Sequence, residues 1–291
     1  IRKWGAAGDG NSQFSYPVGV AVNASSYVYV SDVYNHRIQV FTQDGDYVRQ
    51  WGSNGSEPGH FFGLSDIITG SDGMVYVAEW NNNRIQEFTP SGDYVRQWGS
   101  NGSEPGRFYH PHAVAVNETG FVYVLDSGNN RIQLFTSSGE YLAQAEGLKA
   151  NGYDQFNSTP FGIAVNRSGY VFVTDSANAH VLVYSPSLDS LSWWGSSGSA
   201  NNQFIYPTGI TVNGDDIYVV DALNYCIKKF TSDGSFITSW GSEGFNDGEF
   251  DWPTGIAADD LGGVYVADPG NHRIQKFAFP QPSFEVTTVT I

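Results

Sequence analysis

The chain has 291 residues, of which 40% are hydrophobic and 15% aromatic, and its 14 basic and 30 acidic side chains give a formal net charge of −16. This acidity argues against a phosphate backbone or an anionic membrane as the partner, because both are recognised by clustered cations. No apolar run approaches the roughly 20 residues of a membrane span, and the single cysteine, Cys226, excludes an intramolecular disulfide framework.

A short phrase returns six times along the chain. It reads Asn-His-Arg-Ile-Gln at 35–39 and recurs at 82–86, 129–133, 178–182, 224–228 and 271–275, with the largest changes in the fourth and fifth copies. The steps between the third residues of the copies are 47, 47, 49, 46 and 47. Such a period is typical of repeat architectures in which no unit buries its apolar face alone. We therefore expect one domain over residues 1–280.

The first complete unit predicts four antiparallel strands. Val18–Val22 is a short apolar run, and Tyr27–Val30 is β-branched and aromatic. Arg37–Phe41 alternates polar and apolar residues, and a turn signal containing Asp-Gly separates it from Tyr47–Trp51. Four strands in each unit, with no helical periodicity, indicate an all-β chain folded as a six-bladed β-propeller.

The chain ends predict how the ring closes. The opening Ile1–Gly5 resembles the end of a fourth strand at Val48–Gly52, whereas the last unit ends after its third strand, Ile274–Phe277. We expect the N-terminal strand to join the last blade, because this pairing hides two open edges. Residues 281–291 are expected to be a linker, the start of a downstream segment or an extra edge strand.

The sixth unit carries a recognisable motif. It contains Pro253–Ala257, Val264–Asp268 and Asn271–Phe277, and these segments resemble the NHL repeat. The resemblance covers almost the whole chain and implies a six-bladed propeller, here of an extracellular or cell-surface type. Members of this family include RNA-binding domains, protein-binding scaffolds, extracellular sensor domains and a zinc-dependent amidating lyase. The resemblance thus implies the fold and leaves the function open.

One carboxylate ends the second strand of every blade. The six residues are Asp32, Glu79, Asp126, Asp175, Asp221 and Asp268. A ring of acids suggests a metal funnel, but a residue that every blade carries is better explained as scaffold, with its carboxylate bonding nearby N–H groups and the arginine five residues on. Function is better sought where one blade differs from the others.

The residue after each repeated proline is expected at the mouth of the central channel. These positions hold Val18, Ser65, His112, Phe161, Thr208 and Thr254. The next residue is glycine in four blades, but it is Asp66 in blade two and Ala113 in blade three. With His110 nearby and His60 in the preceding loop, this rim is a candidate divalent-metal or acid–base site. The alternative is a polar rim of solvated histidines.

Aromatic residues give a second departure from the repeat. Between the second strand and the repeated asparagine, blade one has Tyr34 and blade two has Trp80, whereas the other blades have small or aliphatic residues. Exposed aromatic side chains flanked by polar groups are common in peptide and sugar recognition. The alternative is that both rings pack against neighbouring loops.

Six glycosylation sequons fall in predicted loops, where glycans attach in secreted proteins. Their asparagines are Asn23, Asn54, Asn101, Asn117, Asn157 and Asn166. Chance occurrence in loops rich in Asn, Ser and Gly is the alternative explanation. If the sequons are used, the chain is extracellular or lies at the cell surface.

These observations favour a non-enzymatic binding module. We expect a monomeric domain within a larger chain that recognises a protein, peptide or glycan through the face bearing Tyr34, Trp80, Asp66 and His112. The alternative is a metal-assisted lyase or hydrolase at the channel mouth, with His112 as ligand or base, Asp66 as its carboxylate and a divalent metal in the channel. RNA binding is a third possibility that the acidic charge disfavours.

Overall fold

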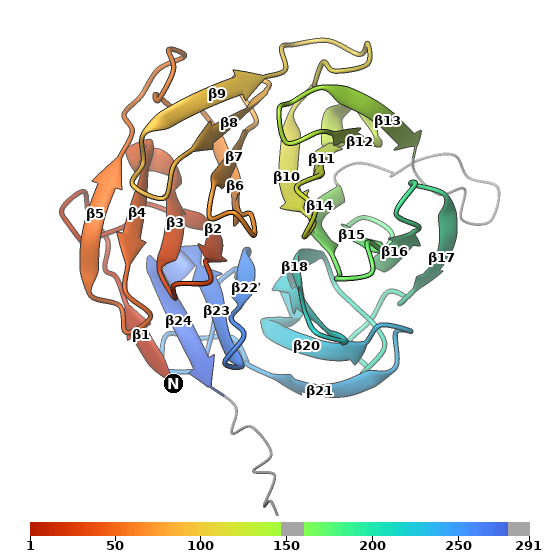
Figure 1. The fold of residues 1–291 in the computed structure, drawn as a ribbon. Helices are drawn as coiled ribbons and strands as arrows, with labels where there is room; N and C mark the ends of the chain where they lie inside the picture. Colours follow the sequence, from red (N-terminus) through yellow and green to blue (C-terminus); the bar gives the residue numbers. More distant parts are fainter. Residues whose placement is uncertain (147–159, 279–291) are drawn as a thin grey trace, which may run out of the picture.

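The computed structural model describes residues 1–146 and 160–278, which form a ring of six four-stranded antiparallel sheets (Figure 1). Each sheet is one blade, with its first strand at the central channel and its fourth strand at the outer edge. The predicted all-β six-bladed propeller is therefore confirmed. In the described part of the chain, no helix is both long and apolar enough to cross a membrane.

The first three blades follow one another in the sequence. Blade one consists of β2 (Pro17–Val22), β3 (Val28–Asp32), β4 (Arg37–Phe41) and β5 (Tyr47–Trp51). Blade two consists of β6 (Leu64–Thr69), β7 (Val75–Glu79), β8 (Arg84–Phe88) and β9 (Tyr94–Trp98). Blade three consists of β10 (Pro111–Val116), β11 (Val122–Asp126), β12 (Arg131–Phe135) and β13 (Tyr141–Glu146).

The second half of the ring repeats this order. Blade four consists of β14 (Pro160–Val165), β15 (Val171–Asp175), β16 (His180–Tyr184) and β17 (Ser190–Trp194). Blade five consists of β18 (Pro207–Asn213), β19 (Asp216–Asp221), β20 (Cys226–Thr231) and β21 (Phe236–Trp240). Blade six consists of β22 (Ile256–Ala258), β23 (Gly263–Asp268), β24 (Arg273–Ala278) and β1 (Arg2–Trp4).

The N-terminal strand closes the ring, as predicted. β1 pairs antiparallel with β24, and the register places Arg2 opposite Lys276 and Trp4 opposite Ile274. The Trp4 ring is buried and lies 5.8 Å from the Phe41 ring of blade one, so the strand also joins the first blade to the last. The residues expected to form a linker or downstream segment, 281–291, lie outside the described part of the chain.

The core lies between neighbouring blades. Each of its six clusters of buried apolar side chains combines residues of two adjacent sheets. Trp51 at the end of β5 contacts Phe88 of blade two at 5.8 Å, and Trp98 contacts Phe135 of blade three at 6.1 Å. The tryptophans that end the fourth strands of blades one and two are therefore packing residues between blades.

The carboxylate that ends each second strand is also structural. Asp32 Oδ2 accepts hydrogen bonds from Asn35, from Arg37 Nε at 2.8 Å and from Gln39, while its Oδ1 accepts one from the backbone N–H of Ser15 at 2.7 Å. β3 runs to this carboxylate, as the repeated motif indicated, and so extends two residues beyond the predicted run Tyr27–Val30; the network forms around its end. It fixes the loop between blades to the turn after the second strand.

Candidate functional site

Tyr34 and Trp80 stand on turns that are held in place by the loops between blades. The backbone N–H of Tyr34 donates to the carbonyl oxygen of Ser15 at 3.1 Å, and that of Trp80 donates to the carbonyl oxygen of Gly63 at 2.8 Å. The side chains remain accessible, with Tyr34 65% exposed and Trp80 44% exposed. A fixed backbone and an accessible ring make Tyr34 and Trp80 suitable as contact residues.

A cavity of about 340 Å³ opens at the mouth of the central channel, on the face that carries these turns. Rings form most of its wall, and we call the cavity and these ring-bearing residues the aromatic cup. They are Tyr16, Tyr34, His36, Phe62, Trp80, His112, Phe161 and Trp252. Blades one to four and the loop leading into blade six each contribute at least one of them. Volume and apolar lining are both typical of a ligand site.

Ring contacts join the wall of the cup. Tyr16 stacks on Tyr34 with centroids 5.4 Å apart, and Trp80 lies 6.4 Å from His112, which in turn lies 4.2 Å from Phe161. Each exposed ring is therefore supported on one side by a neighbour while another part of its surface stays open. The rings therefore pack against their neighbours and also line a cavity, and a role in recognition stays a prediction.

Gly63 keeps the cup open on the side of blade two. The residue at this position is aromatic or histidine in four of the other blades, at Tyr16, His110, Tyr206 and Trp252, and is Thr159 in blade four. Gly63 has a φ of +75°, and a Cβ atom there would lie 2.8 Å from the backbone nitrogen of Asn81. The close approach of Asn81, and not the positive φ, requires glycine here, because Tyr16, His110 and Trp252 also have a positive φ. Blade two therefore leaves room where its neighbours place a ring.

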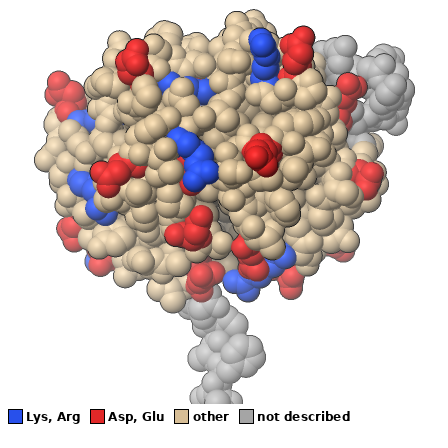
Figure 2. All heavy atoms as spheres, turned by 45° about the horizontal axis from the view of Figure 1, so that its top comes forward, with Lys and Arg blue, Asp and Glu red and all other residues tan. Residues whose placement is uncertain are grey.

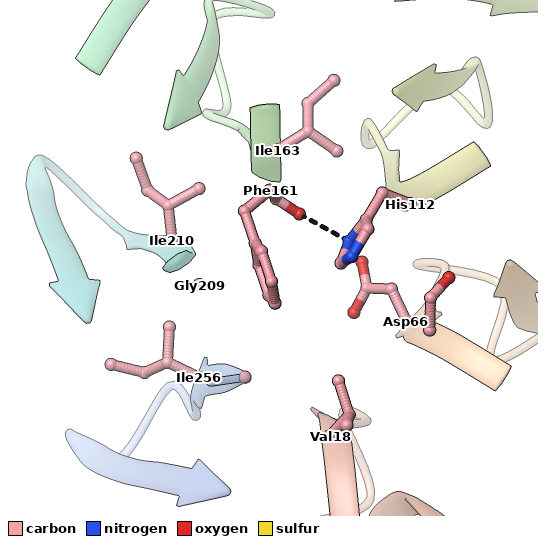
Figure 3. Close-up of a pocket in the computed structure, with 11 residues that line it drawn as sticks. Val18, Asp66, His112, Phe161, Ile163, Gly209, Ile210 and Ile256 are labelled. Atoms are coloured by element: carbon pink, nitrogen blue, oxygen red, sulfur yellow. Dashed lines mark hydrogen bonds between the residues drawn. The ribbon is translucent and has the colours of Figure 1, made fainter. Parts of the chain in front are cut away.

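Below the cup the channel narrows to a cavity of about 30 Å³, which we call the constriction. Asp66, His112 and Phe161 point into it, with aliphatic side chains such as Ile210 and Ile256 on the other walls (Figure 3). A wider cavity of about 200 Å³ lies on the far side and is also lined by Asp66. The Asp66 carboxyl therefore stands between the two ends of the channel.

Burial shifts the titration of both ionisable groups in the constriction. Burial raises the pKa of Asp66 to about 7. Hydrogen bonds from the backbone N–H groups of Val114 and Ile67 lower the pKa, but their effect is smaller. Burial lowers the pKa of His112 to about 4, against a hydrogen bond from its Nδ1 to the carbonyl oxygen of Phe161, 3.2 Å away. Near neutral pH the histidine is thus uncharged and the carboxyl can exchange a proton.

The residues chosen from the sequence do not all come together. Tyr34, Trp80, His112 and Phe161 line the cup, and Asp66 lies deeper, in the constriction. His110 lies behind Trp80, with ring centroids 5.1 Å apart, and is not among the lining residues.

His60 lies apart from the cup. Its Nδ1 is 2.8 Å from the Ser53 hydroxyl, and its carbonyl oxygen accepts a hydrogen bond from Arg84. A metal site on this rim also lacks a ligand set, because no group of three candidate metal ligands occurs in residues 1–146 and 160–278.

Four members of the cup were not predicted, and one of them, His36, belongs to the repeated turn. Tyr16, Phe62 and Trp252 belong to the two positions that precede the repeated proline, and a comparison of these positions between blades would have shown their aromatic character. Phe62 is 47% exposed although its backbone N–H is fixed by the Glu79 carboxylate at 3.0 Å. The repeat thus positions each loop, while the side chains on the loop are free to differ.

The sequons differ in accessibility. Asn54 and Asn101 are exposed, whereas Asn23, Asn117 and Asn166 are partly buried. The Nδ2 atom of Asn23, to which a glycan would attach, donates to the Tyr29 hydroxyl at 3.1 Å. Asn157 lies outside the described residues.

Comparisons with known proteins identify the repeat and the fold. Four segments match the family model of the NHL repeat, namely 14–41, 108–135, 204–230 and 250–277. These matches fall in blades one, three, five and six, whereas blade two differs from the repeat at Leu64 and Asp66 and blade four at His180. No curated protein matches the chain in sequence.

Solved structures resemble the chain as a whole. A protein of unknown function from Bacteroides thetaiotaomicron has 20% identity and a TM-score of 0.72, over 94% of this chain and 74% of that one. An inactive virginiamycin B lyase from Staphylococcus aureus, solved with quinupristin, has 18% identity and a TM-score of 0.62, over 93% and 87%. A chain of a nidogen/laminin complex has 14% identity and a TM-score of 0.60, over 78% and 81%. At these identities the likeness shows the fold alone.

Proposed function

Because this chain is a six-bladed β-propeller that carries NHL repeats, we propose that it is a non-enzymatic binding module that recognises a protein or peptide through the aromatic cup. The observation that carries the proposal is the cup itself, in which exposed rings of blades one and two surround about 340 Å³ at the channel mouth. Aromatic anchors in a preformed cavity are the usual centre of a recognition site.

The polar groups of the cup favour a protein or peptide over a glycan. Sugar hydroxyl groups need several hydrogen-bond partners, but the Thr254 hydroxyl already donates to the Val18 carbonyl oxygen at 3.0 Å. The Ser65 hydroxyl is likewise committed, 3.2 Å from the Ala78 carbonyl oxygen. The cup therefore offers ring surface more than hydrogen bonds, and this suits amino-acid side chains.

Charge distribution excludes a polyanion from the proposal. On the face drawn in Figure 2, basic side chains are scattered singly among acidic ones and form no continuous basic patch. The net charge of −16 has the same consequence, because nucleic acid and anionic lipid surfaces require clustered cations. An extracellular or cell-surface location belongs to the proposal and is supported by the exposed sequons at Asn54 and Asn101.

A screen of peptide and glycan arrays tests the function. We expect a peptide ligand whose affinity falls at least about ten-fold on Trp80→Ala, as expected for a buried aromatic anchor. Trp193→Ala is the matched control, because Trp193 is exposed on the outer strand of blade four, where its ring packs on His180. Equal affinity of the parent and Trp80→Ala for every ligand found would remove the cup as the binding site, and a glycan ligand would overturn the assignment to peptides.

An enzyme acting at the channel mouth is the second candidate. One observation favours it: Asp66, whose pKa burial raises to about 7, shares the constriction with His112. A carboxyl group with such a pKa is suited to acid–base chemistry near neutral pH. Two measurements test this candidate: elemental analysis of the purified protein, and lyase and hydrolase assays on the parent and on His112→Ala. The candidate would be excluded if the protein holds no metal and if His112→Ala is as active as the parent.

A further inference from the structure

The aromatic cup and the constriction together have the charge pattern of a cation site. Of the described residues that line either cavity, none is lysine or arginine, and Asp66 is the one carboxyl group. His36 and His112 are the histidines among them, and burial holds the pKa of His112 near 4. A cation entering the channel therefore approaches ring faces and a carboxyl group, both of which attract positive charge.

Asp66 has no cationic partner of its own in the described part of the chain. Its Oδ2 accepts the backbone N–H of Val114 at 3.1 Å, and the N–H of Ile67 is its second donor. The carboxylates of the repeat contrast with it, since Asp32, for example, is paired with Arg37 Nε at 2.8 Å. Asp66 is only partly buried and is reached from the channel, so a ligand that brings a cation to this carboxylate gains affinity there.

The sizes of the two cavities select the shape of the ligand. The constriction, at about 30 Å³, has about a tenth of the volume of the cup, at about 340 Å³. A primary ammonium group is compact enough for this space, whereas the planar guanidinium group of arginine is larger. The cup above it offers ring surface against which an apolar stem can lie. A long apolar stem that ends in a compact cation is a lysine side chain.

We propose that the aromatic cup receives a lysine side chain of the protein partner, with its methylene stem against Trp80 and Tyr34 and its ammonium group directed into the constriction toward Asp66. This inference rests on the proposed function and adds to it the identity of the anchor residue. Phe161 and Val18 line both cavities and form the passage between them.

Three capped tripeptides test the proposal: acetyl-Gly-Lys-Gly-amide, its norleucine analogue with the same stem and no charge, and its arginine analogue. Binding is followed by NMR through the indole N–H signals of Trp80 and Trp252. We expect the lysine peptide to bind at least about five-fold more tightly than either analogue, as expected for a desolvated cation beside aromatic rings. Asp66→Asn, which keeps the shape of the side chain, should abolish this preference and leave norleucine binding unchanged.

The outcomes separate this inference from the proposed function. If the norleucine or the arginine peptide binds as tightly as the lysine peptide, and Trp80→Ala weakens both, the cup is a binding site without selectivity for lysine and the inference is wrong. If lysine selectivity survives in Asp66→Asn, the role of Asp66 is wrong. If Trp80→Ala changes no affinity, or no peptide binds, the cup is not the site, and the proposed function fails with the inference. Norleucine binding by Asp66→Asn shows that the variant is folded.

Discussion

The Asp66 carboxylate accepts a hydrogen bond of 3.1 Å from the backbone N–H of Val114, which joins the innermost strands of blades two and three. Blade one has Gly19 at the position of Asp66. In that blade the pairing of the first two strands is interrupted after Pro17 and resumes at Val20. In blade two the pairing resumes at Asp66 itself, opposite Ala78. The substitution therefore changes the local path of the strand and also places a carboxyl group in the channel.

The unusual position of Asp66 predicts a pH-dependent stability. Because the pKa is raised to about 7 in the folded protein, the folded state holds the proton more tightly than the unfolded chain, whose carboxyl has its ordinary pKa of 3.8. The carboxyl thus costs little stability below pH 4, and its cost grows as the pH rises toward 7. Asn carries no charge, so Asp66→Asn should gain stability over the parent across this range.

We expect the gain at pH 8 relative to pH 4 to be on the order of 2 kcal/mol, since one pKa unit corresponds to about 1.4 kcal/mol and the channel keeps the group partly hydrated. Urea unfolding at both pH values measures it, with the exposed Asp260→Asn as control. His112 lines the same constriction and is present in the parent and in both variants, so its own titration contributes equally to all three proteins. A difference between parent and Asp66→Asn that does not change with pH would show that Asp66 ionises normally.

Blade five predicts a large effect at Lys228. Cys226 occupies the position of the repeated arginine, and Lys228 replaces the repeated glutamine, so that its Nζ lies 2.9 Å from Asp221 Oδ2 with both side chains buried. Lys228→Met should lower the free energy of unfolding by about 3 kcal/mol, because Asp221 would be left without its cation. Chemical denaturation measures this loss.

A double variant provides the control for this prediction. Cys226→Arg combined with Lys228→Gln restores the residues that blade one has at Arg37 and Gln39, where the Asp32 carboxylate is fully bonded. We expect this variant to recover most of the stability lost in Lys228→Met. Equal stability of the parent and Lys228→Met would contradict the assignment of Lys228 as the replacement cation.

Ring closure predicts that the first residues are essential to stability. Deletion of residues 1–5 removes the pairing of β1 with β24, the buried Trp4 ring and the ion pair of Arg2 with Asp44 at 2.8 Å. We expect a clearly lower melting temperature and association through the bare edge of β24, since each lost ladder bond is worth roughly 1 kcal/mol net. Calorimetry and light scattering measure both effects.

A truncated chain that melts like the parent and stays monomeric would mean that β1 does not hold the ring together. Deletion of residues 284–291 is the matched control for chain length.

The fold could be predicted almost completely from the sequence, because period, strand alternation and turn chemistry act locally. The third and fourth strands of blade one, Arg37–Phe41 and Tyr47–Trp51, were predicted with their observed bounds. The second strand extends two residues beyond the predicted run Tyr27–Val30, to the carboxylate that the repeated motif indicated as its end.

The cup could be predicted only in part. Tyr34 and Trp80 stand out because they break a repeat, whereas Tyr16 and Trp252 are far apart in the sequence and share a cavity only because the ring closes. His60 was included because it is near Asp66 in the sequence, but its side chain bonds to Ser53 in the loop and not to the rim. Proximity in the sequence does not decide which side of a loop a side chain occupies.

The central claim is that a partner binds at the aromatic cup, and amide hydrogen exchange of the protein with and without its ligand tests it most directly. We predict slower exchange at the turns that carry Tyr34 and Trp80 and around His112, where the backbone borders the cup. The outer strand β17, Ser190–Trp194, should exchange at the same rate in both samples. Slower exchange confined to the outer strands, with the three cup segments unchanged, would contradict the claim.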